Sequence, residues 1–129
     1  MQVPEELRYS EEHEWVRIAD GVATIGITDH AQHELGDIVF VELPALGTTL
    51  AKSATLGVVE SVKAVSDVYA PIGGTVITVN ERLTASPEIL NEDPYGEGWM
   101  IKVQVADAND VATLMTAAQY REFVAQEKV

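Results

Sequence analysis

Apolar residues, many of them β-branched, cluster in short stretches that polar residues, glycine and proline interrupt, and this pattern predicts a mainly β protein. Residues 15–18 and 22–27 lie on either side of the turn Ala19-Asp20-Gly21, which predicts a hairpin. Further strands are predicted at residues 38–43, 56–62, 65–70 and 75–79. Many short strands with turn residues between them favour a flattened barrel or a sandwich of two sheets.

Two regions carry helix signals instead. Residues 28–36 begin with the capping residue Thr28 and end with Gly36, which predicts one or two helical turns. Near the C-terminus, apolar residues at helical spacing over residues 111–118 predict a further helix. The segment Thr116-Ala117-Ala118-Gln119 resembles a capping box and predicts the start of another. We therefore expect one or two helices lying on the β core at the C-terminal end.

The chain contains a weak internal repeat. Residues 36–43 can be aligned with residues 74–81, and residues 57–62 with residues 100–105. Two such copies would each cover the apolar face that the other leaves exposed. The connection between the strands of the second copy, residues 81–98, is long enough to predict a functional loop or one that packs on itself.

Composition indicates a globular protein, because 47% of its 129 residues are hydrophobic and 22% are charged. We predict a single domain over residues 1–129, with a core at about 15–106 and a C-terminal helical segment at about 109–127. With 8 Lys and Arg against 21 Asp and Glu, the net charge of -13 disfavours nucleic acid and anionic membranes as partners. No apolar stretch reaches the roughly 20 residues of a membrane span, so we expect a cytoplasmic protein.

Few residues suggest chemistry by the polypeptide itself. The chain has no cysteine, and its serines and glycines form neither a GxSxG elbow nor a phosphate-binding loop. His30 and His33 would share a helix face, but the local sequence supplies no third ligand. His13-Glu14 is followed by Arg17 where HExxH would need histidine. We interpret His30 and His33 as surface residues on a short capped helix, and we predict neither catalytic residues nor a metal site.

Lys63 stands out among the four lysines because it lies at the bend between the strands predicted at residues 56–62 and 65–70. A hairpin tip projects its side chain away from the sheet, so an enzyme could reach the ε-amine from several directions. The small neighbour Ala64 leaves that approach open. Spacing alone does not distinguish a modified lysine from an ordinary exposed one.

Five segments, spread from about residue 8 to residue 124, occur in the order typical of one known family. They are His13-Glu14-Trp15-Val16, Gly26 to Gln32, Leu35 to Val39, Glu60-Ser61-Val62-Lys63-Ala64, and Asn91 to Met100. On these segments the chain resembles the H proteins of the glycine cleavage system. The resemblance implies a barrel-sandwich hybrid, the fold of lipoyl and biotinyl domains, made of two pseudo-symmetric halves with short helices.

The resemblance also implies a cofactor and partners. Lys63 matches the lysine that carries lipoate in amide linkage, placed there by a lipoate-attaching enzyme. Such a carrier is not an enzyme. In a bacterial cytoplasm it takes an aminomethyl group from the pyridoxal-phosphate-dependent glycine decarboxylase, the P protein. The tetrahydrofolate-dependent aminomethyltransferase, the T protein, removes it, and dihydrolipoamide dehydrogenase, the L protein, reoxidises the dithiol.

In the family, acidic residues near the lipoyl arm keep the aminomethyl amine protonated, and the matching positions here are Glu14 and Asp67. Some relatives carry histidine directly before the Leu-Gly pair, where this chain has Glu34, with His33 one residue earlier. We therefore expect Glu14 and Asp67 to hold the aminomethyl ammonium, and we assign no histidine to the cleft.

Alternative carriers share this architecture. A biotinyl domain usually has methionine on both sides of its lysine, and a 2-oxoacid dehydrogenase lipoyl domain usually has aspartate before it. Here Val62 and Ala64 flank Lys63. A protein that relays lipoyl groups to other complexes remains an alternative. An unmodified adaptor is the alternative of a different class, and the intact Glu60-to-Ala64 segment argues against it.

Overall fold

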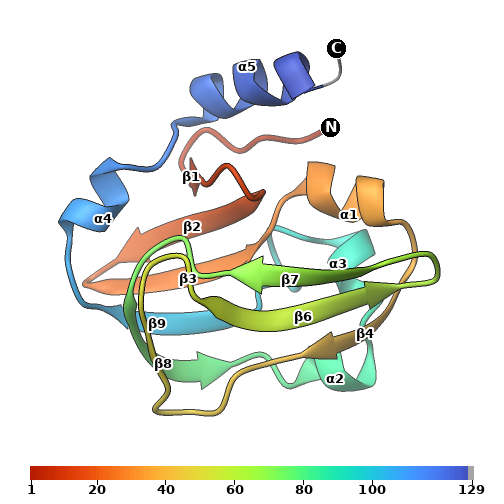
Figure 1. Ribbon diagram of the computed structural model, residues 1–129, viewed down its shortest axis with the longest axis horizontal. Helices are drawn as coiled ribbons and strands as arrows, with labels where there is room; N and C mark the ends of the chain where they lie inside the picture. Colours follow the sequence, from red (N-terminus) through yellow and green to blue (C-terminus); the bar gives the residue numbers. More distant parts are fainter. Residues whose placement is uncertain (128–129) are drawn as a thin grey trace.

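The computed structural model describes residues 1–127, which fold into two antiparallel β-sheets with short helices around them (Figure 1). The strands are β1 Arg8–Tyr9, β2 Glu14–Ala19, β3 Val22–Ile27, β4 Ile38–Glu42, β5 Thr49–Leu50, β6 Thr55–Ser61, β7 Val65–Tyr69, β8 Gly74–Val79 and β9 Ile101–Val105. The helices are α1 Asp29–Leu35, α2 Arg82–Ala85, α3 Ile89–Glu92, α4 Asn109–Ala112 and α5 Ala117–Glu127. Within residues 1–127, no helix has the length and apolar character needed to cross a bilayer.

The two sheets enclose the main hydrophobic core. The larger sheet has the strand order β1-β2-β3-β9-β8-β5, and the smaller has the order β4-β6-β7 (Figure 1). Ile25 and Val103 from the larger sheet and Val59 and Val68 from the smaller one are buried in the same cluster. Each such side chain contributes about 1.5–3 kcal/mol by leaving water. The two sheets therefore stabilise each other through a shared core, and the prediction of a mainly β sandwich is confirmed.

The internal repeat has a clear structural counterpart. Its first copy forms the antiparallel pair β4–β6, with Val41 opposite Val59. Its second copy forms the antiparallel pair β8–β9, with Val76 opposite Val103. The two pairs lie in different sheets. The predicted mutual covering of two strand pairs is confirmed.

Local turn and cap signals account for the first hairpin and the first helix. Asp20 and Gly21 both have positive φ, 53° and 76°, which is the conformation of a type I′ hairpin turn between β2 and β3. Thr28 caps α1, because its side chain accepts a hydrogen bond from the backbone of Ala31. The helix ends at Gly36, as predicted, with φ at 83°.

The C-terminal helix prediction is half right. The capping box is confirmed, because Gln119 N–H donates to Thr116 Oγ1 at 3.2 Å and Thr116 N–H donates to Gln119 Oε1 at 2.9 Å. The continuous helix predicted over residues 111–118 is wrong, since α4 ends at Ala112. Met115 and Tyr9 instead exchange backbone hydrogen bonds of 2.8 and 2.9 Å. A strand-like contact with the start of the chain replaces a second helical turn.

A second apolar cluster joins the two ends of the chain. The rings of Tyr9 and Tyr120 stack with centroids 4.6 Å apart, and Leu7, Trp15 and Val124 are buried with them. In Figure 1, α5 accordingly lies beside the N-terminal segment and β1. This cluster fixes the turn that leads into β2, and that turn forms part of the site described below.

Candidate functional site

The β6–β7 hairpin presents Lys63 at an exposed but well-bonded tip. Ser61 Oγ accepts the backbone N–H of Lys63 at 3.3 Å and that of Ala64 at 3.1 Å. Ser61 N–H donates to Ala64 O at 2.8 Å, and Val62 N–H donates to Asp37 O at 3.0 Å. These bonds give partners to the N–H groups of all three turn residues, Val62, Lys63 and Ala64. They stabilise the backbone of the tip although solvent surrounds it.

The side chain of Lys63 is exposed and lies over the end of α1. A Cβ placed on Gly36 would stand 3.6 Å from Lys63 Cε, so the lysine stem passes above this glycine. Val62 and Val65, on either side of the tip, are 71% and 68% exposed. Exposed valines beside an exposed amine form a surface that a modifying enzyme can cover.

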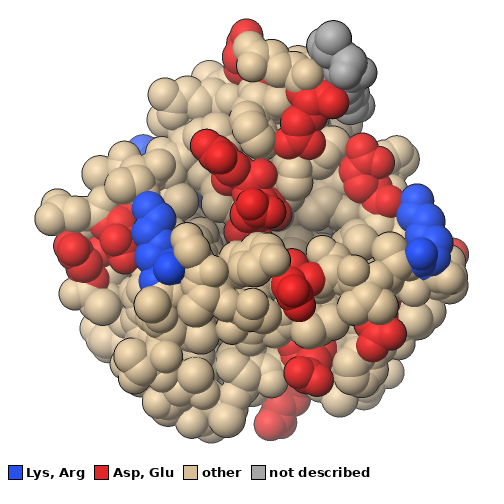
Figure 2. All heavy atoms as spheres, viewed as in Figure 1, with Lys and Arg blue, Asp and Glu red and all other residues tan. Residues whose placement is uncertain are grey.

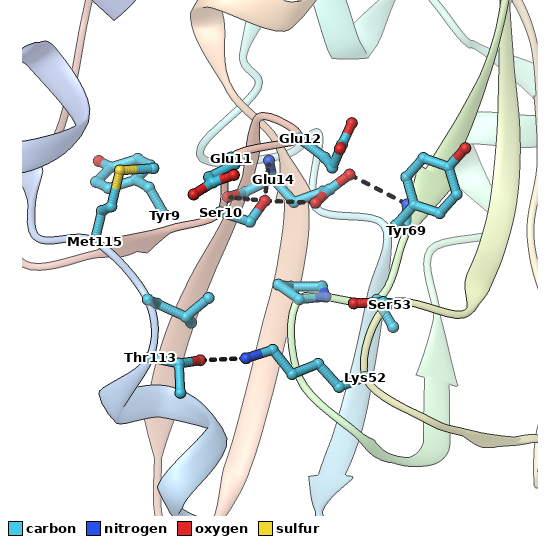
Figure 3. A pocket seen from close by; sticks show the side chains of 13 residues that line it. Tyr9, Ser10, Glu11, Glu12, Glu14, Lys52, Ser53, Tyr69, Thr113 and Met115 are labelled. Atoms are coloured by element: carbon cyan, nitrogen blue, oxygen red, sulfur yellow. Dashed lines mark hydrogen bonds between the residues drawn. The ribbon is translucent and has the colours of Figure 1, made fainter. Parts of the chain in front are cut away.

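A cavity of about 410 Å³ lies between the turn before β2, the end of β7 and the segment after α4 (Figure 3). Its walls come from residues 9–12, 14, 52–53, 69–71 and 113–115. These segments are far apart in sequence. The second apolar cluster and the backbone bridge between Tyr9 and Met115 hold the turn before β2 and the segment after α4 together. The cavity therefore depends on the complete fold.

Glu14 is the buried acid of this cavity, with only 2% of its surface exposed. Its Oε1 accepts the Ser10 hydroxyl at 2.5 Å, and its Oε2 accepts the Tyr69 N–H at 3.1 Å (Figure 3). Burial raises the pKa of the Glu14 carboxyl to about 7, the two hydrogen bonds partly oppose this rise, and the nearby Glu12 adds to it. A bound cation would offset the free energy that the ionised carboxylate loses when burial removes its hydration.

The turn before β2 positions this carboxyl. Ser10 N–H donates to Glu14 O at 2.9 Å, and Glu14 N–H donates to Ser10 Oγ at 3.0 Å. His13, inside the turn, has φ at 70°. Its Nδ1 lies 2.8 Å from the Tyr120 hydroxyl on α5. The C-terminal helix thus supports the residue next to Glu14.

The charges in and around the cavity favour a cation. Glu11, Glu12 and Glu14 line it, against a single lysine, Lys52, which donates a hydrogen bond to Thr113 on the opposite wall (Figure 3). Within residues 1–127, neither lysine nor arginine forms an ion pair with Glu14. Figure 2 shows acidic side chains across the middle of this face and basic ones toward its sides. The field here attracts positive charge.

Asp67, the other predicted acidic residue, lies outside the cavity walls. It is an exposed residue of β7, opposite Val58 of β6. Glu14 binds the backbone N–H of Tyr69, two residues farther along β7. Asp67 therefore lies two residues from this contact along the strand, without direct contact with Glu14 in the described residues.

The structure corrects the interpretation of the histidines as surface residues. His33 is exposed, but His30 is only 5% exposed. The His30 ring packs against His13, with centroids 4.6 Å apart, and not against its helix neighbour. Sequence spacing within one helix could not show this pairing, because His13 belongs to the turn before β2.

The two facing sheets, with a lysine at the exposed tip of a hairpin, define a barrel-sandwich hybrid, the architecture of lipoyl and biotinyl carrier domains. The model of one family, described as glycine cleavage H-protein, matches residues 7–127. The chain belongs to this family. The resemblance seen in the sequence segments is therefore confirmed over almost the whole chain.

Individual relatives agree with this assignment. The chain is 58% identical over 120 residues to the probable glycine cleavage system H protein of Haloarcula marismortui, covering 93% of this chain and 94% of that relative. It is 54% identical over 127 residues to the H protein of Anoxybacillus flavithermus, covering 98% and 100%. The crystal structure of the H protein from Mycobacterium marinum matches with a TM-score of 0.86 at 38% identity, covering 98% and 100%.

Proteins of this family are the lipoyl carriers of the glycine cleavage system, and this chain is such a carrier. It works with the enzymes of that system. The sequence prediction of the fold is also confirmed: a mainly β barrel-sandwich hybrid with short helices, including those at the C-terminus.

Proposed function

We propose that Lys63 carries the lipoyl group and that the polypeptide is a mobile substrate, not itself an enzyme. The observation that supports this most directly is the position of Lys63 at an exposed hairpin tip, where Ser61 Oγ accepts the backbone N–H groups of Lys63 and Ala64. A primary amine is required to form the amide, and the tip offers one that solvent surrounds. Lipoate in this linkage supplies a redox-active disulfide, which a chain without cysteine cannot provide.

The residues around the tip fit such a tether. The stem of Lys63 passes over Gly36, and the exposed Val62 and Val65 give a partner apolar surface to cover around the attachment point. We propose four partners: the P, T and L proteins of the glycine cleavage system and a lipoate-attaching enzyme. We further propose that residues 1–129 form one lipoyl-carrier domain and that it works in the cytoplasm of a bacterium.

We propose that Glu14, with Asp67, holds the ammonium of the aminomethyl cargo. An aminomethyl group bonded to sulfur decomposes when its nitrogen lone pair expels the thiol, and protonation removes that lone pair. The buried Glu14 carboxylate favours the charged amine, and the cavity walls limit access of water. Asp67, on the exposed side of β7, adds negative charge at the approach to the cavity.

Loss of either carboxylate should shorten the lifetime of the cargo. We expect Glu14→Gln to raise the rate of spontaneous aminomethyl loss roughly 10- to 150-fold, because it removes one charge-assisted contact of roughly 1.5–3 kcal/mol. Asp67→Asn, at an exposed position, should raise it less, about twofold. The rate is measured by mass spectrometry of the loaded protein over time. Glu42→Gln, an exposed substitution on β4, is the matched control. Unchanged rates of loss in both Glu14→Gln and Asp67→Asn would show that these carboxylates do not hold the aminomethyl ammonium.

Intact-mass measurement of the chain purified from its own cell tests the proposed attachment. We expect a lipoyl mass increment that proteolysis assigns to the peptide containing Lys63. A biotinyl increment would instead indicate a biotin carrier. An unmodified mass, in cells that lipoylate their other carriers, would indicate an adaptor. Either of the last two results would overturn the proposal.

A further inference from the structure

Three side chains that could bind a metal meet outside the cavity that Glu14 lines. His13 comes from the turn before β2, His30 from α1 and Glu127 from the end of α5. His13 Nε2 lies 3.1 Å from Glu127 Oε2, and His30 Nε2 lies 4.0 Å from Glu127 Oε1. One ligand atom from each residue lies within 4.8 Å of the other two. Two imidazoles and a carboxylate are a common ligand set for zinc in proteins.

We propose that His13, His30 and Glu127 bind a divalent transition metal ion, Zn²⁺ being the best match. In a tetrahedral site with metal–ligand distances of about 2.0–2.1 Å, neighbouring ligand atoms stand roughly 3.3 Å apart. His13 and His30 approach different oxygens of Glu127, at 3.1 and 4.0 Å, and one ligand atom from each residue lies within 4.8 Å of the others. Glu127 is at the end of a helix and its side chain is 39% exposed, so rotation of this side chain can bring one oxygen toward both imidazoles as the ligands close around an ion.

The surroundings of His13 orient its free nitrogen toward the site. Its Nδ1 lies 2.8 Å from the Tyr120 hydroxyl, which in turn lies 2.7 Å from Thr28 Oγ1. Thr28 Oγ1 can accept both this hydroxyl and the N–H of Ala31, so Nδ1–H of His13 can donate to Tyr120. That arrangement leaves the lone pair on Nε2, the atom facing Glu127. Zinc-bound histidines typically donate their second ring N–H in this way.

The backbone of His13 supports the same conclusion. Its φ of 70° is uncommon for a residue with a side chain and costs about 1 kcal/mol. Such conformations persist where the surroundings impose them, and they cluster at functional sites. Here the conformation places the imidazole against the His30 ring, with centroids 4.6 Å apart. The strain thus brings two potential ligands together.

An ion can reach the site from solvent. His30 also lines a separate surface cavity of about 290 Å³, together with Asp29, His33 and Glu34. Glu34 Oε1 lies 3.8 Å from His30 Nε2 and its side chain is 63% exposed, so it can supply a fourth ligand or leave that position to water. A bound ion would tie α5 to α1 and to the turn that holds Glu14.

Titration calorimetry with ZnCl₂ tests this site. The sample is the untagged full-length chain with Lys63 unmodified, so that neither a tag nor a dithiol competes for the ion. We expect one Zn²⁺ per chain with a Kd of about 10 µM or tighter. Glu127→Gln and His30→Gln should each weaken binding at least tenfold. His33→Gln, which removes the exposed histidine of the same helix, should change the Kd less than twofold.

Nuclear magnetic resonance supplies a second readout that does not depend on the variants. On addition of Zn²⁺, the ring signals of His13 and His30 should shift while those of His33 stay in place. Absence of stoichiometric binding by the wild-type chain would overturn the proposal. Weakening by His33→Gln with no effect of Glu127→Gln would also overturn it, since that result indicates binding at the α1 surface alone.

Discussion

Lys63→Arg is expected to abolish lipoylation and glycine turnover while leaving the protein folded. The guanidinium keeps the positive charge, but it stays protonated and offers no nucleophilic amine for the amide bond. The bonds that hold the tip run through Ser61 and the backbone, so the substitution does not disturb them. Glycine-dependent release of carbon dioxide, in a reaction reconstituted with the partner enzymes, should fall to the level without carrier.

Lys102→Arg is the matched control for this experiment, because Lys102 lies on β9, away from the hairpin and outside the cavity walls. We expect it to acquire the lipoyl increment and to retain most of the turnover. The thermal unfolding midpoints of both variants should stay close to that of the wild type. Turnover by a folded Lys63→Arg protein would show that the chain does not work through this amine.

Glu14→Gln is expected to change the pH dependence of stability. Burial raises the pKa of Glu14 from 4.5 to about 7, so the folded chain retains a proton that the unfolded chain has already released. Between about pH 4.5 and 7 the unfolded state therefore binds fewer protons, and the free energy of unfolding falls as pH rises. The stabilising contribution of the neutral carboxyl is complete below pH 4.5 and is lost as pH rises through 7.

The size of this effect follows from the pKa difference. Each pH unit in the window costs up to about 1.4 kcal/mol, which gives on the order of 3 kcal/mol over the whole window. The glutamine amide avoids this cost, because it does not ionise. Its oxygen can accept the Tyr69 N–H and its NH₂ can donate to Ser10. Above pH 7, Glu14→Gln should therefore be more stable than the wild type.

Urea unfolding from pH 4.5 to 8.5, in metal-free buffer, measures this difference. The wild type should lose about 3 kcal/mol more than Glu14→Gln across the range. Glu11→Gln, which removes an exposed carboxylate of the same turn, should follow the wild-type curve. Parallel curves for wild type and Glu14→Gln would mean that the buried carboxyl is ionised at no cost. A variant that is more stable yet keeps its cargo for a shorter time would show stability traded for function.

The elements that depend on neighbouring residues could be predicted from the sequence. The β2–β3 hairpin follows from Asp20-Gly21, α1 from Thr28 and Gly36, and the start of α5 from the capping box at Thr116. In each case the residues that decide the structure lie within about ten positions of one another. The end of α4 could not be predicted in this way, because Met115 leaves the helical pattern to pair with Tyr9, more than a hundred residues earlier.

The same distinction applies to the site. Lys63 and Glu14 lie in contiguous segments, so the family resemblance could identify them. The partners of Glu14 come from Ser10, across a turn, and from the backbone of Tyr69, which shows no side-chain signal at all. The contact between His13 and His30 joins a turn to a helix, and no spacing rule links the two. Tertiary contacts of this kind follow only from the assembled sheets.

The wall of the cavity formed by residues 113–115 has a consequence for synthesis. These residues are synthesised after the β6–β7 hairpin, so a growing chain has no closed cavity when this hairpin has already emerged. A product that stops short of α4 would still contain Lys63 and could still receive its cofactor. It would, however, have no shelter for the cargo. Only a chain that includes residues 113–115 has both the attachment lysine and the closed cavity. Premature termination would therefore produce carriers that accept the aminomethyl group and then lose it.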